Sequence, residues 1–290
     1  HEVAVICGPG GYGGGNTTEG GASPVPTGIT VRRMKATRFG RAHSLGKILD
    51  YASFYLLAGT SLLGMRKPDV VISLTTPPYL SVLGRFGSLL RGAKHSHWVM
   101  DLYPDVLEAH GFLKGGSGGR RLLGGLAKLG WGGARNTGVL SLGPDMHART
   151  AAHIPASVRQ AWIPLWGMTE ENTEPSAAAV ENLRHKRGWE REDLVLMYSG
   201  NMGLGHRFQE FLQASKDRPE NVRFVFFGRG KRRTEIEDFR SGNPEKVELH
   251  DYVESEDLAA HLRSADVHLG SLEPSWDGVM VPSKLQGFFA

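Results

Sequence analysis

The chain has 290 residues and a net charge of +4, with 40% hydrophobic residues, 22% charged residues and a single cysteine. This length is typical of about two domains, and the composition excludes a disordered or fibrous protein. The lone Cys7 excludes an intramolecular disulfide and favours a reducing compartment such as the cytosol.

The charge is divided unevenly along the chain. Residues 1–160 hold 18 Lys and Arg against 8 Asp and Glu, whereas residues 161–290 hold 16 against 22. This division predicts two domains with different partners, and the basic part suits anionic lipid or an anionic acceptor. An ordinary solvated basic surface is the alternative. Nucleic acid is not expected as a partner, because basic and aromatic residues do not interleave.

Strand and helix patterns alternate along the first half. Strands are expected at Val3–Cys7, Ile29–Lys35, Val70–Leu74, Ser96–Met100 and Gly138–Ser141. Helices are expected at Leu45–Met65, Leu80–Leu90, Val106–Phe112, Arg121–Ala134 and Asp145–Ala152. Thr76 is the expected N-cap of the second helix, with Pro77 in its first turn. This alternation predicts a parallel sheet covered on both faces.

The apolar run Tyr51–Met65 has 15 residues, too few to span a bilayer. It is interpreted as a core helix, and a helix lying in a membrane interface is the alternative.

A break in the pattern at Ile163–Glu174 predicts a domain boundary, with domains at 1–163 and 164–290. Beyond it, strands are expected at Leu194–Ser199, Val222–Gly228, Val247–His250 and Val267–Leu272. Helices are expected at Ala177–Gly188, His206–Lys216, Lys231–Ser241 and Ser255–Ala265, and from Ser283 onward. The pattern predicts an open Rossmann-type sheet, and such sheets bind ligands at the carboxyl ends of their strands.

Two glycine-rich loops follow strands of this second half. The loop Tyr198–His206 allows backbone N–H groups to approach a phosphate, helped by the positive end of the helix expected near His206. It does not have the Walker pattern. The loop Phe227–Lys231 could approach a base or a ribose through its glycines. The four cations in and just after this loop are expected to form a solvated face: Arg229, Lys231, Arg232 and Arg233.

A third loop, Asp277–Lys284, leads into the last expected helix. Lys284 falls in the first turn of that helix, where a cation is unfavourable unless an anionic ligand is present. In the first half, Asp101 follows a buried strand, where a carboxylate can accept a proton or bind acceptor hydroxyls. Asp105 better fits a capping role. The histidines and carboxylates show no metal-binding spacing, and no Ser-His-Asp pattern is found.

Four segments resemble motifs of one enzyme family. They are Val99–Asp105 (D-L-[WYF]-P-[DE]), Tyr198–Gly203 (Y-S-G-N-[ML]-G), Phe226–Gly230 (F-x-G-x-G) and Val281–Leu285 ([VM]-P-S-K-L). In order and spacing the chain resembles the family-4 retaining glycosyltransferases, most closely the bacterial colanic-acid-type branch. The resemblance covers nearly the whole chain. It implies the GT-B fold, an α/β architecture of two Rossmann-like domains facing a cleft, with the first strand and the C-terminal end missing.

The resemblance also implies roles for individual residues. Asp101 corresponds to the acceptor-side motif and is the candidate catalytic residue. The candidate donor-binding residues are Gly200, Asn201, Gly203, His206, Gly228, Gly230, Asp251, Tyr252, Ser283 and Lys284. Three departures stand out. Met100 replaces a His that contacts the donor sugar in many relatives, and Asn201 and His206 replace Arg and Lys of the phosphate loop. The E-x7-E carboxylates of the wider family fall near Val279 and Gly287.

The expected activity is therefore retaining transfer of a sugar from a nucleoside diphosphate sugar, with no metal and no cofactor beyond this co-substrate. The expected acceptor is a glycan or a lipid-linked sugar in cell-surface polysaccharide synthesis, used in the cytoplasm or at the inner face of the plasma membrane. Two alternatives remain open: a nucleotide-sugar 2-epimerase of the same fold, and an inactive nucleotide-sugar-binding module. A chain without its first strand is expected to be much less active than its parent.

Overall fold

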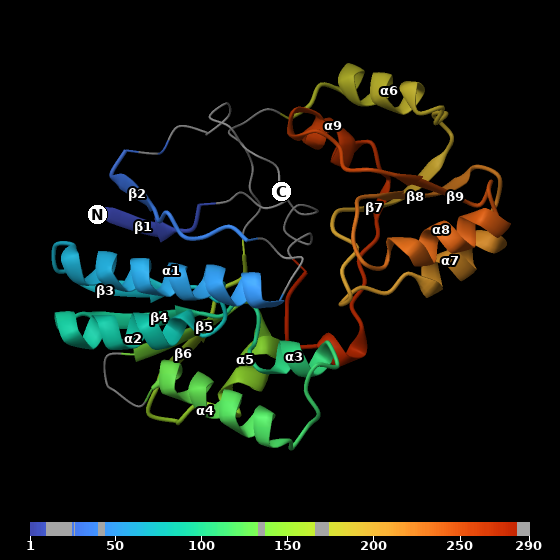
Figure 1. The fold of residues 1–290 in the computed structure, drawn as a ribbon. Helices are drawn as coiled ribbons and strands as arrows, with labels where there is room; N and C mark the ends of the chain where they lie inside the picture. The colour runs from blue at the N-terminus through green and yellow to red at the C-terminus, as the bar shows by residue number, and fades with distance from the viewer. Residues whose placement is uncertain (10–24, 26, 40–43, 133–136, 166–173, 283–290) are drawn as a thin grey trace. The chain divides into compact units, whose positions relative to one another are not determined.

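The computed structural model describes residues 1–9, 25, 27–39, 44–132, 137–165 and 174–282. It divides into two compact units, each of which mixes helices and strands (Figure 1). The first unit comprises His1–Pro104, Leu113–Ser141 and His147–Trp162. The second comprises Asp105–Phe112, Leu142–Met146 and Ile163–Ala290. All strand pairs are parallel in the part of the chain described, as the alternating sequence pattern predicts.

The first unit has two parallel sheets. Its strands are β1 (Val3–Cys7), β2 (Ile29–Arg33), β3 (Val70–Ser73), β4 (Lys94–Trp98), β5 (Thr137–Ser141) and β6 (Arg159–Trp162). Its helices are α1 (Ser44–Gly64), α2 (Leu80–Arg91) and α4 (Gly118–Trp131), and α5 (Pro144–Ala151) has residues in both units. One sheet has the order β1-β2 and the other β3-β4-β5-β6.

The division into two sheets differs from the single parallel sheet expected for this half. Among the described residues, β1 pairs with β2 alone and β3 with β4 alone. Apolar side chains of both strands are exposed, including Val3 at 46% and Ile72 at 59%. Their β-branched sequences predict strands correctly, but such a local signal does not specify which strands pair.

Helix α2 starts at the expected residue but without the expected cap. Thr76 and Pro77 were the expected cap and first turn, but their peptide bond is cis and the helix begins at Leu80. Tyr79 precedes the helix with φ of 66° and makes no side-chain capping hydrogen bond. Strand β6 was not predicted, because its sequence Arg-Gln-Ala-Trp has no β-branched residue; it forms by pairing with β5.

Helix α1 contains the apolar run and has two different faces. Phe54, Ala58 and Leu62, spaced four residues apart, are buried, which supports the core-helix interpretation. Leu45 and Leu56 remain 75% and 72% exposed. No helix within the described ranges is both long enough and apolar enough to cross a bilayer.

The second unit is built on one four-stranded sheet of order β10-β7-β8-β9. Its strands are β7 (Leu194–Ser199), β8 (Val222–Phe227), β9 (Val247–His250) and β10 (Val267–His268). Its helices are α3 (Asp105–Ala109), α6 (Ala177–Lys186), α7 (Gln209–Lys216), α8 (Arg233–Gly242) and α9 (Leu258–Arg263), with short 3-10 helices η1 (Ser255–Asp257) and η2 (Pro274–Trp276).

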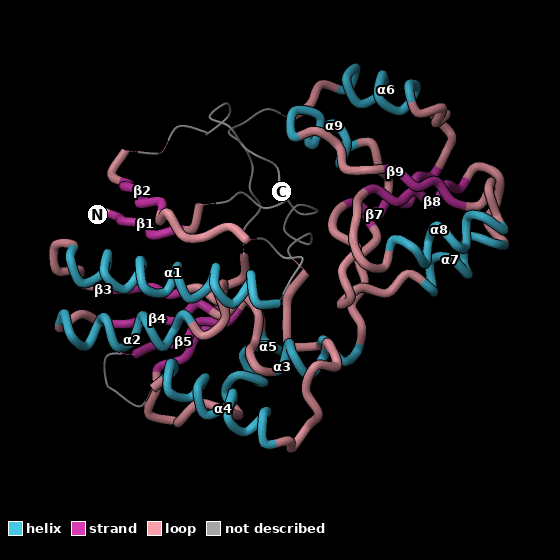
Figure 2. Tube along the Cα trace, in the orientation of Figure 1, coloured by secondary structure: helices cyan, strands magenta, loops and turns pink. Residues whose placement is uncertain are grey.

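Side chains alternate across this sheet and bury both faces. Phe224 and Phe226 join one apolar cluster, together with residues of α7 and α8. Val225 and Phe227 join a second cluster on the opposite face. Figure 2 shows α7 and α8 on one side of these strands and α6 and α9 on the other. A strand buried on both faces is apolar at nearly every position, as β8 is.

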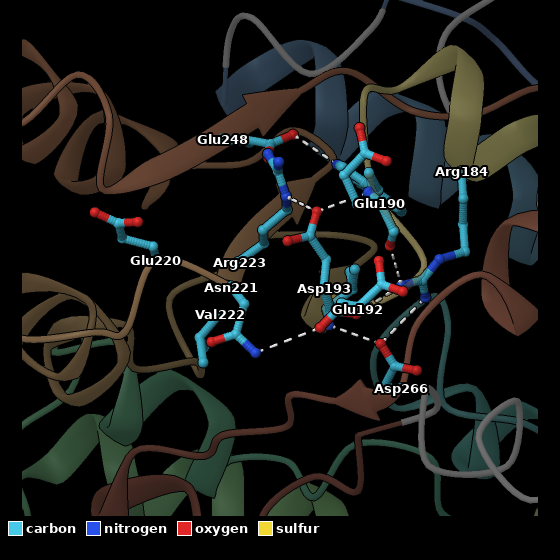
Figure 3. Close-up of polar contacts among 12 residues, drawn as sticks. Arg184, Glu190, Glu192, Asp193, Glu220, Asn221, Val222, Arg223, Glu248 and Asp266 are labelled. Atoms are coloured by element: carbon cyan, nitrogen blue, oxygen red, sulfur yellow. Dashed lines mark hydrogen bonds and ion pairs between the residues drawn. The ribbon is translucent and has the colours of Figure 1, made fainter.

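Ion pairs gather where β7, β8 and β9 begin. Figure 3 shows Arg223 bonded to Asp193 and Glu248, and Arg184 bonded to Asp266. Asp193 immediately precedes β7, and Arg223 and Glu248 are each the second residue of a strand. Because parallel sheets of this type bind ligands at the opposite, carboxyl ends, these pairs are structural supports.

Candidate functional site

The loops that follow β7 and β8 are joined by backbone hydrogen bonds. The Gly200 N–H donates to the Phe227 carbonyl at 2.9 Å, and the Met202 N–H donates to the Arg229 carbonyl at 2.8 Å. The Gly228 N–H donates to the His250 carbonyl at 3.1 Å, which links β8 to the end of β9. The carboxyl end of the sheet is therefore one connected surface.

Glycine is required in these loops by the closeness of their backbones. A Cβ on Gly228 would lie 2.0 Å from the Gly200 carbonyl oxygen, and one on Gly230 would lie 2.4 Å from that of Met202. Gly200, Gly228 and Gly230 also have φ of 131°, 132° and 151°, which side chains disfavour. These glycines thus shape the loops. The Gly200, Met202 and Gly228 N–H groups all donate to carbonyls of neighbouring loops or strands.

His206 holds this loop to the segment that follows β10. Its side chain is buried, and Nδ1 lies 2.9 Å from the Ser271 carbonyl, which can only accept, so Nδ1 carries the proton. The expected helix start near His206 is wrong: α7 begins at Gln209, three residues later. The chain up to that point is held to the segment after β10, where the Glu273 N–H donates to the Gly205 carbonyl at 2.8 Å.

The strand order supports a binding site here. From β7 the chain continues to β8 and β9 on one side, and then returns to place β10 on the other side of β7. The crevice outside the carboxyl ends at such a switch point is where open α/β sheets bind ligands. Ser271 and Glu273 lie on the β10 side of it. Sequence reasoning missed both, because no local motif marks them.

The cations of the second loop are not the simple solvated face that was expected. Arg232 pairs with Glu273 at 2.7 Å, and both side chains are about three-quarters buried. Arg233 donates to the His250 carbonyl at 3.0 Å and pairs with Asp251 at 3.1 Å. Two of the four predicted surface cations therefore connect loops, which local sequence could not indicate.

Asp251 and Tyr252 lie beside this second loop. Arg229 contacts Asp251 through two nitrogens, at 2.7 and 3.2 Å, and these hydrogen bonds hold the pKa of the carboxyl below its usual value. The exposed Tyr252 hydroxyl donates to the Arg229 carbonyl at 3.3 Å. The structure thus places both residues beside the second loop. Ser283 and Lys284 lie outside the described residues, which extend to Pro282 in this segment.

A buried histidine supports the start of the loop that follows β7, and the sequence did not indicate it. His261 of α9 lies 2.9 Å through Nε2 from the hydroxyl of Ser199, the residue before Gly200. The Arg187 guanidinium donates to Nδ1 at 3.0 Å and stacks 4.7 Å from the centre of the Phe227 ring. Because Arg187 can only donate, the His261 proton resides on Nε2.

Asp101 lies in the first unit, just beyond the end of β4. Its side chain is half-buried, and burial raises the pKa of its carboxyl. The hydroxyl of Thr75 accepts from the N–H groups of Met100 and Asp101 at 2.8 and 3.4 Å, which sets the direction of this segment. Asp105, by contrast, is 3% exposed at the start of α3, in agreement with a structural role.

The surroundings of Asp101 are aromatic and uncharged. It lines a cavity of about 10 Å³, the size of one water, with Tyr79, His97 and Tyr103. His97 and its strand neighbour His95 both bond to the Ser73 hydroxyl, at 3.3 and 2.9 Å. Burial lowers the pKa of each imidazole to about 4, so both are neutral at physiological pH. Over the described residues, no group of three or more His, Cys, Asp or Glu could hold a metal ion.

The buried histidines predict loss of stability in mild acid. His261 has its pKa lowered to about 3, first by burial and then by Arg187. Because these groups titrate near 6.5 when unfolded, the unfolded chain binds more protons as the pH falls from 6.5 toward 4. Each histidine should then reduce the free energy of unfolding by about 1.4 kcal/mol per pH unit. Urea unfolding at pH 7, 6 and 5 measures this dependence.

In His261→Gln, about one proton fewer should be taken up on unfolding, so the free energy of unfolding should fall less steeply as the pH is lowered. The variant should nevertheless be less stable at pH 7. The matched control is His185→Gln, since His185 is exposed on α6. An unchanged slope in His261→Gln would contradict the prediction.

Several solved structures share this architecture. HepE of Anabaena, solved with UDP and glucose, matches with a TM-score of 0.56 and 12% identity over 83% of this chain and 59% of that one. WaaG, a glycosyltransferase involved in lipopolysaccharide biosynthesis, matches with a TM-score of 0.59 and 15% identity over 87% and 64%. The chain has the GT-B fold. It spans about three-fifths of the length of these neighbours.

The same fold also occurs in the N-terminal domain of trehalose-6-phosphate phosphatase from Candida albicans, at a TM-score of 0.58 and 15% identity over 87% of this chain and 64% of that one. No protein-family model and no curated protein sequence matches the chain. The GT-B fold therefore rests on structure alone, and a fold by itself does not determine an activity.

Proposed function

We propose that this GT-B protein transfers a sugar from a nucleoside diphosphate sugar to a glycan or lipid-linked acceptor, with retention at the anomeric carbon. The observation that carries the proposal is the connected surface at the carboxyl end of the second sheet, where Gly200, Gly228 and Gly230 bring two loops into backbone contact. This surface lies at the switch point in strand order, where open α/β sheets bind nucleotides. The four sequence motifs and the fold both support this assignment.

The proposed chemistry divides between the two units. The second unit binds the donor, with loop N–H groups and Lys284 stabilising the departing diphosphate without a metal ion. HepE was also solved with UDP-glucose, and UDP is accordingly the first nucleotide to test here. The first unit binds the acceptor. Asp101, whose pKa is raised by burial, is suited to accept a proton or to hold an acceptor hydroxyl.

The proposed setting is cell-surface polysaccharide synthesis, in the cytoplasm or at the inner face of the plasma membrane. The exposed Leu45 and Leu56 of α1 lie in the basic half of the chain, and apolar plus cationic surface is what binds anionic membranes. Peripheral membrane contact through the first unit is therefore part of the proposal.

A binding module without activity is the second candidate, favoured by the fold's presence in a domain of a phosphatase. Release of nucleoside diphosphate from a panel of nucleotide sugars, measured on the full-length protein, distinguishes the two. Transfer predicts release that increases when the acceptor is added. Binding shown by thermal shift, with no release from any nucleotide sugar, would overturn the proposal. A 2-epimerase would instead yield the epimeric sugar.

Transfer is also expected to continue without a divalent ion. The reason is that backbone amides and Lys284 supply the positive potential that a metal supplies elsewhere. Turnover should be the same with EDTA as with Mg²⁺ or Mn²⁺. If EDTA abolished turnover and Mn²⁺ restored it, the proposed donor site would be wrong.

Lys284→Ala should weaken nucleoside diphosphate binding about tenfold or more, since 1.4 kcal/mol corresponds to a factor of ten. A charge-assisted bond to phosphate contributes about 1.5–3 kcal/mol. Isothermal titration of the full-length protein with UDP and with uridine measures the effect. Uridine should bind both forms equally, because it has no phosphate. Equal UDP affinity in both forms would remove Lys284 from the site.

A further inference from the structure

A strongly basic pocket of the first unit lies along α4. It has a volume of about 350 Å³, and its charged or titratable lining residues are Arg120, Arg121, Lys128 and His153. Pro104 and Trp131 add apolar surface, and the lining contains no acidic side chain. The proposed function uses none of these residues.

Two of the pocket's cations, Arg120 and Arg121, are unfavourably placed for α4 itself. The helix begins at Gly118 after the Ser117 cap, and its first turn holds no acidic residue while Arg120 and Arg121 follow immediately. Cations near a helix N-terminus oppose the helix dipole. A bound anion would reverse that effect, and two guanidinium groups can bind a phosphate through paired hydrogen bonds.

Two adjacent glycines create the space in the middle of α4. Glycine is one of the poorest helix formers, so a glycine pair in a helix interior calls for a reason. Close packing explains Gly130, where a Cβ would lie 2.3 Å from the Ser81 hydroxyl. It does not explain Gly125, where a Cβ would meet nothing within 4 Å. Gly124 and Gly125 both line the pocket, and they keep it open.

The basic pocket adjoins the surroundings of Asp101. Ala127 and Trp131 line both the basic pocket and the small cavity that contains Asp101. Pro104 of the basic pocket belongs to the same short segment as Asp101 and Tyr103. A ligand held by the basic pocket would therefore lie next to the candidate catalytic carboxylate.

We propose that the basic pocket of α4 binds a phosphate group of the acceptor. The inference rests on the proposed function, in that it assigns this phosphate to the acceptor and not to the nucleotide sugar. The pocket is large enough for a sugar phosphate, and its cations are matched to a doubly charged phosphate monoester. Under this proposal, the acceptor is an anionic glycan or glycolipid that carries a phosphate group.

The test measures binding of glucose 1-phosphate to the full-length protein saturated with UDP, by isothermal titration, with glucose as the uncharged comparison. The double variant Arg121→Gln, Lys128→Gln should weaken glucose 1-phosphate binding about tenfold or more and leave UDP affinity unchanged. Arg66→Gln is the control for loss of an exposed cation elsewhere in the same unit, because Arg66 is exposed and does not line the pocket. An equal loss in Arg66→Gln, or no loss in the double variant, would overturn the proposal.

Gly125→Leu separates binding from folding. Leu favours a helix more than Gly does, so the melting temperature should stay the same or rise, while the side chain fills the pocket and glucose 1-phosphate binding falls at least tenfold. Unchanged binding in this variant would contradict the pocket assignment. Vesicles of phosphatidylglycerol test the other source of phosphate. If the double variant lost binding to vesicles but not to glucose 1-phosphate, the pocket would be a membrane contact and the acceptor proposal would be wrong.

The two proposals fail in distinguishable ways. Wild-type protein that binds UDP but not glucose 1-phosphate would refute the acceptor pocket and leave the transferase proposal standing. Protein that binds no nucleotide, yet loses glucose 1-phosphate binding in the double variant, would refute the transferase proposal and support the pocket as an anion site.

Discussion

Asp101→Asn should reduce turnover by about a hundredfold or more, because a positioned proton acceptor contributes about 10²–10⁴-fold and an amide cannot accept the proton. The variant should nevertheless be as stable as the wild type at pH 7, or more stable. Burial raises the pKa of the Asp101 carboxyl above its unfolded value, so its ionised form is unfavourable in the folded protein. Release of nucleoside diphosphate gives the turnover, and urea unfolding gives the stability.

The sign of the pH effect provides a second measurement. A carboxyl with a raised pKa adds stability below its unfolded pKa, and that stability is lost as the pH rises through the folded pKa. Any advantage of the Asn variant over the wild type should therefore shrink as the pH is lowered. Asp105→Asn is the control: Asp105 is buried, so this variant should lose about 1–3 kcal/mol of stability and keep its turnover per folded molecule. Normal turnover in Asp101→Asn would exclude Asp101 from catalysis.

Gly228→Ala is the second change with a large expected effect. The new Cβ would lie 2.0 Å from the Gly200 carbonyl oxygen and 2.8 Å from its carbon, and neither backbone atom can rotate away. The loops would have to separate, which breaks the hydrogen bond from Gly200 N–H to Phe227. Strain at a φ of 132° adds to this cost. We expect a loss of about 2–5 kcal/mol in the free energy of unfolding.

The same change should weaken UDP binding tenfold or more, because the displaced loop carries the proposed phosphate contacts. Gly242→Ala is the matched control. A Cβ on Gly242, at the end of α8, would meet nothing within 4 Å, so that variant should be as stable as the wild type or up to about 1 kcal/mol more stable. Urea unfolding and UDP titration of both variants test the prediction. A Gly228→Ala protein with normal stability and UDP affinity would contradict this account of the loops.

Much of the fold could be predicted from local sequence. The strands Val3–Cys7, Leu194–Ser199 and Val247–His250 were predicted with the boundaries the structure has. The first two are short apolar runs, and the third alternates apolar and polar residues. The helix boundaries were less accurate, as at α7, which starts three residues later than expected because the preceding loop is held by Ser271, a residue distant in sequence.

The candidate site was only partly predictable. Glycines after strands identified Gly200, Gly228 and Gly230 as special, but sequence reasoning assigned Gly200 to phosphate contact and the other two to the approach of a base or a ribose. The structure shows that Gly228 and Gly230 are needed first because two loops pack backbone against backbone. Ser271, Glu273 and His261 went unnoticed, since they reach the loops from segments about 60 residues away.

The sequence by itself determined the alternation of strands and helices, the parallel α/β class and the positions of the loops. These depend on side-chain periodicity and on backbone preferences, both of which act over a few residues. Only the tertiary structure decided that the first half forms two sheets, that Arg232 and Arg233 connect loops, and that Gly125 opens a basic pocket beside Asp101. These features arise from contacts between segments far apart in the chain, and such contacts leave no local pattern from which they can be predicted.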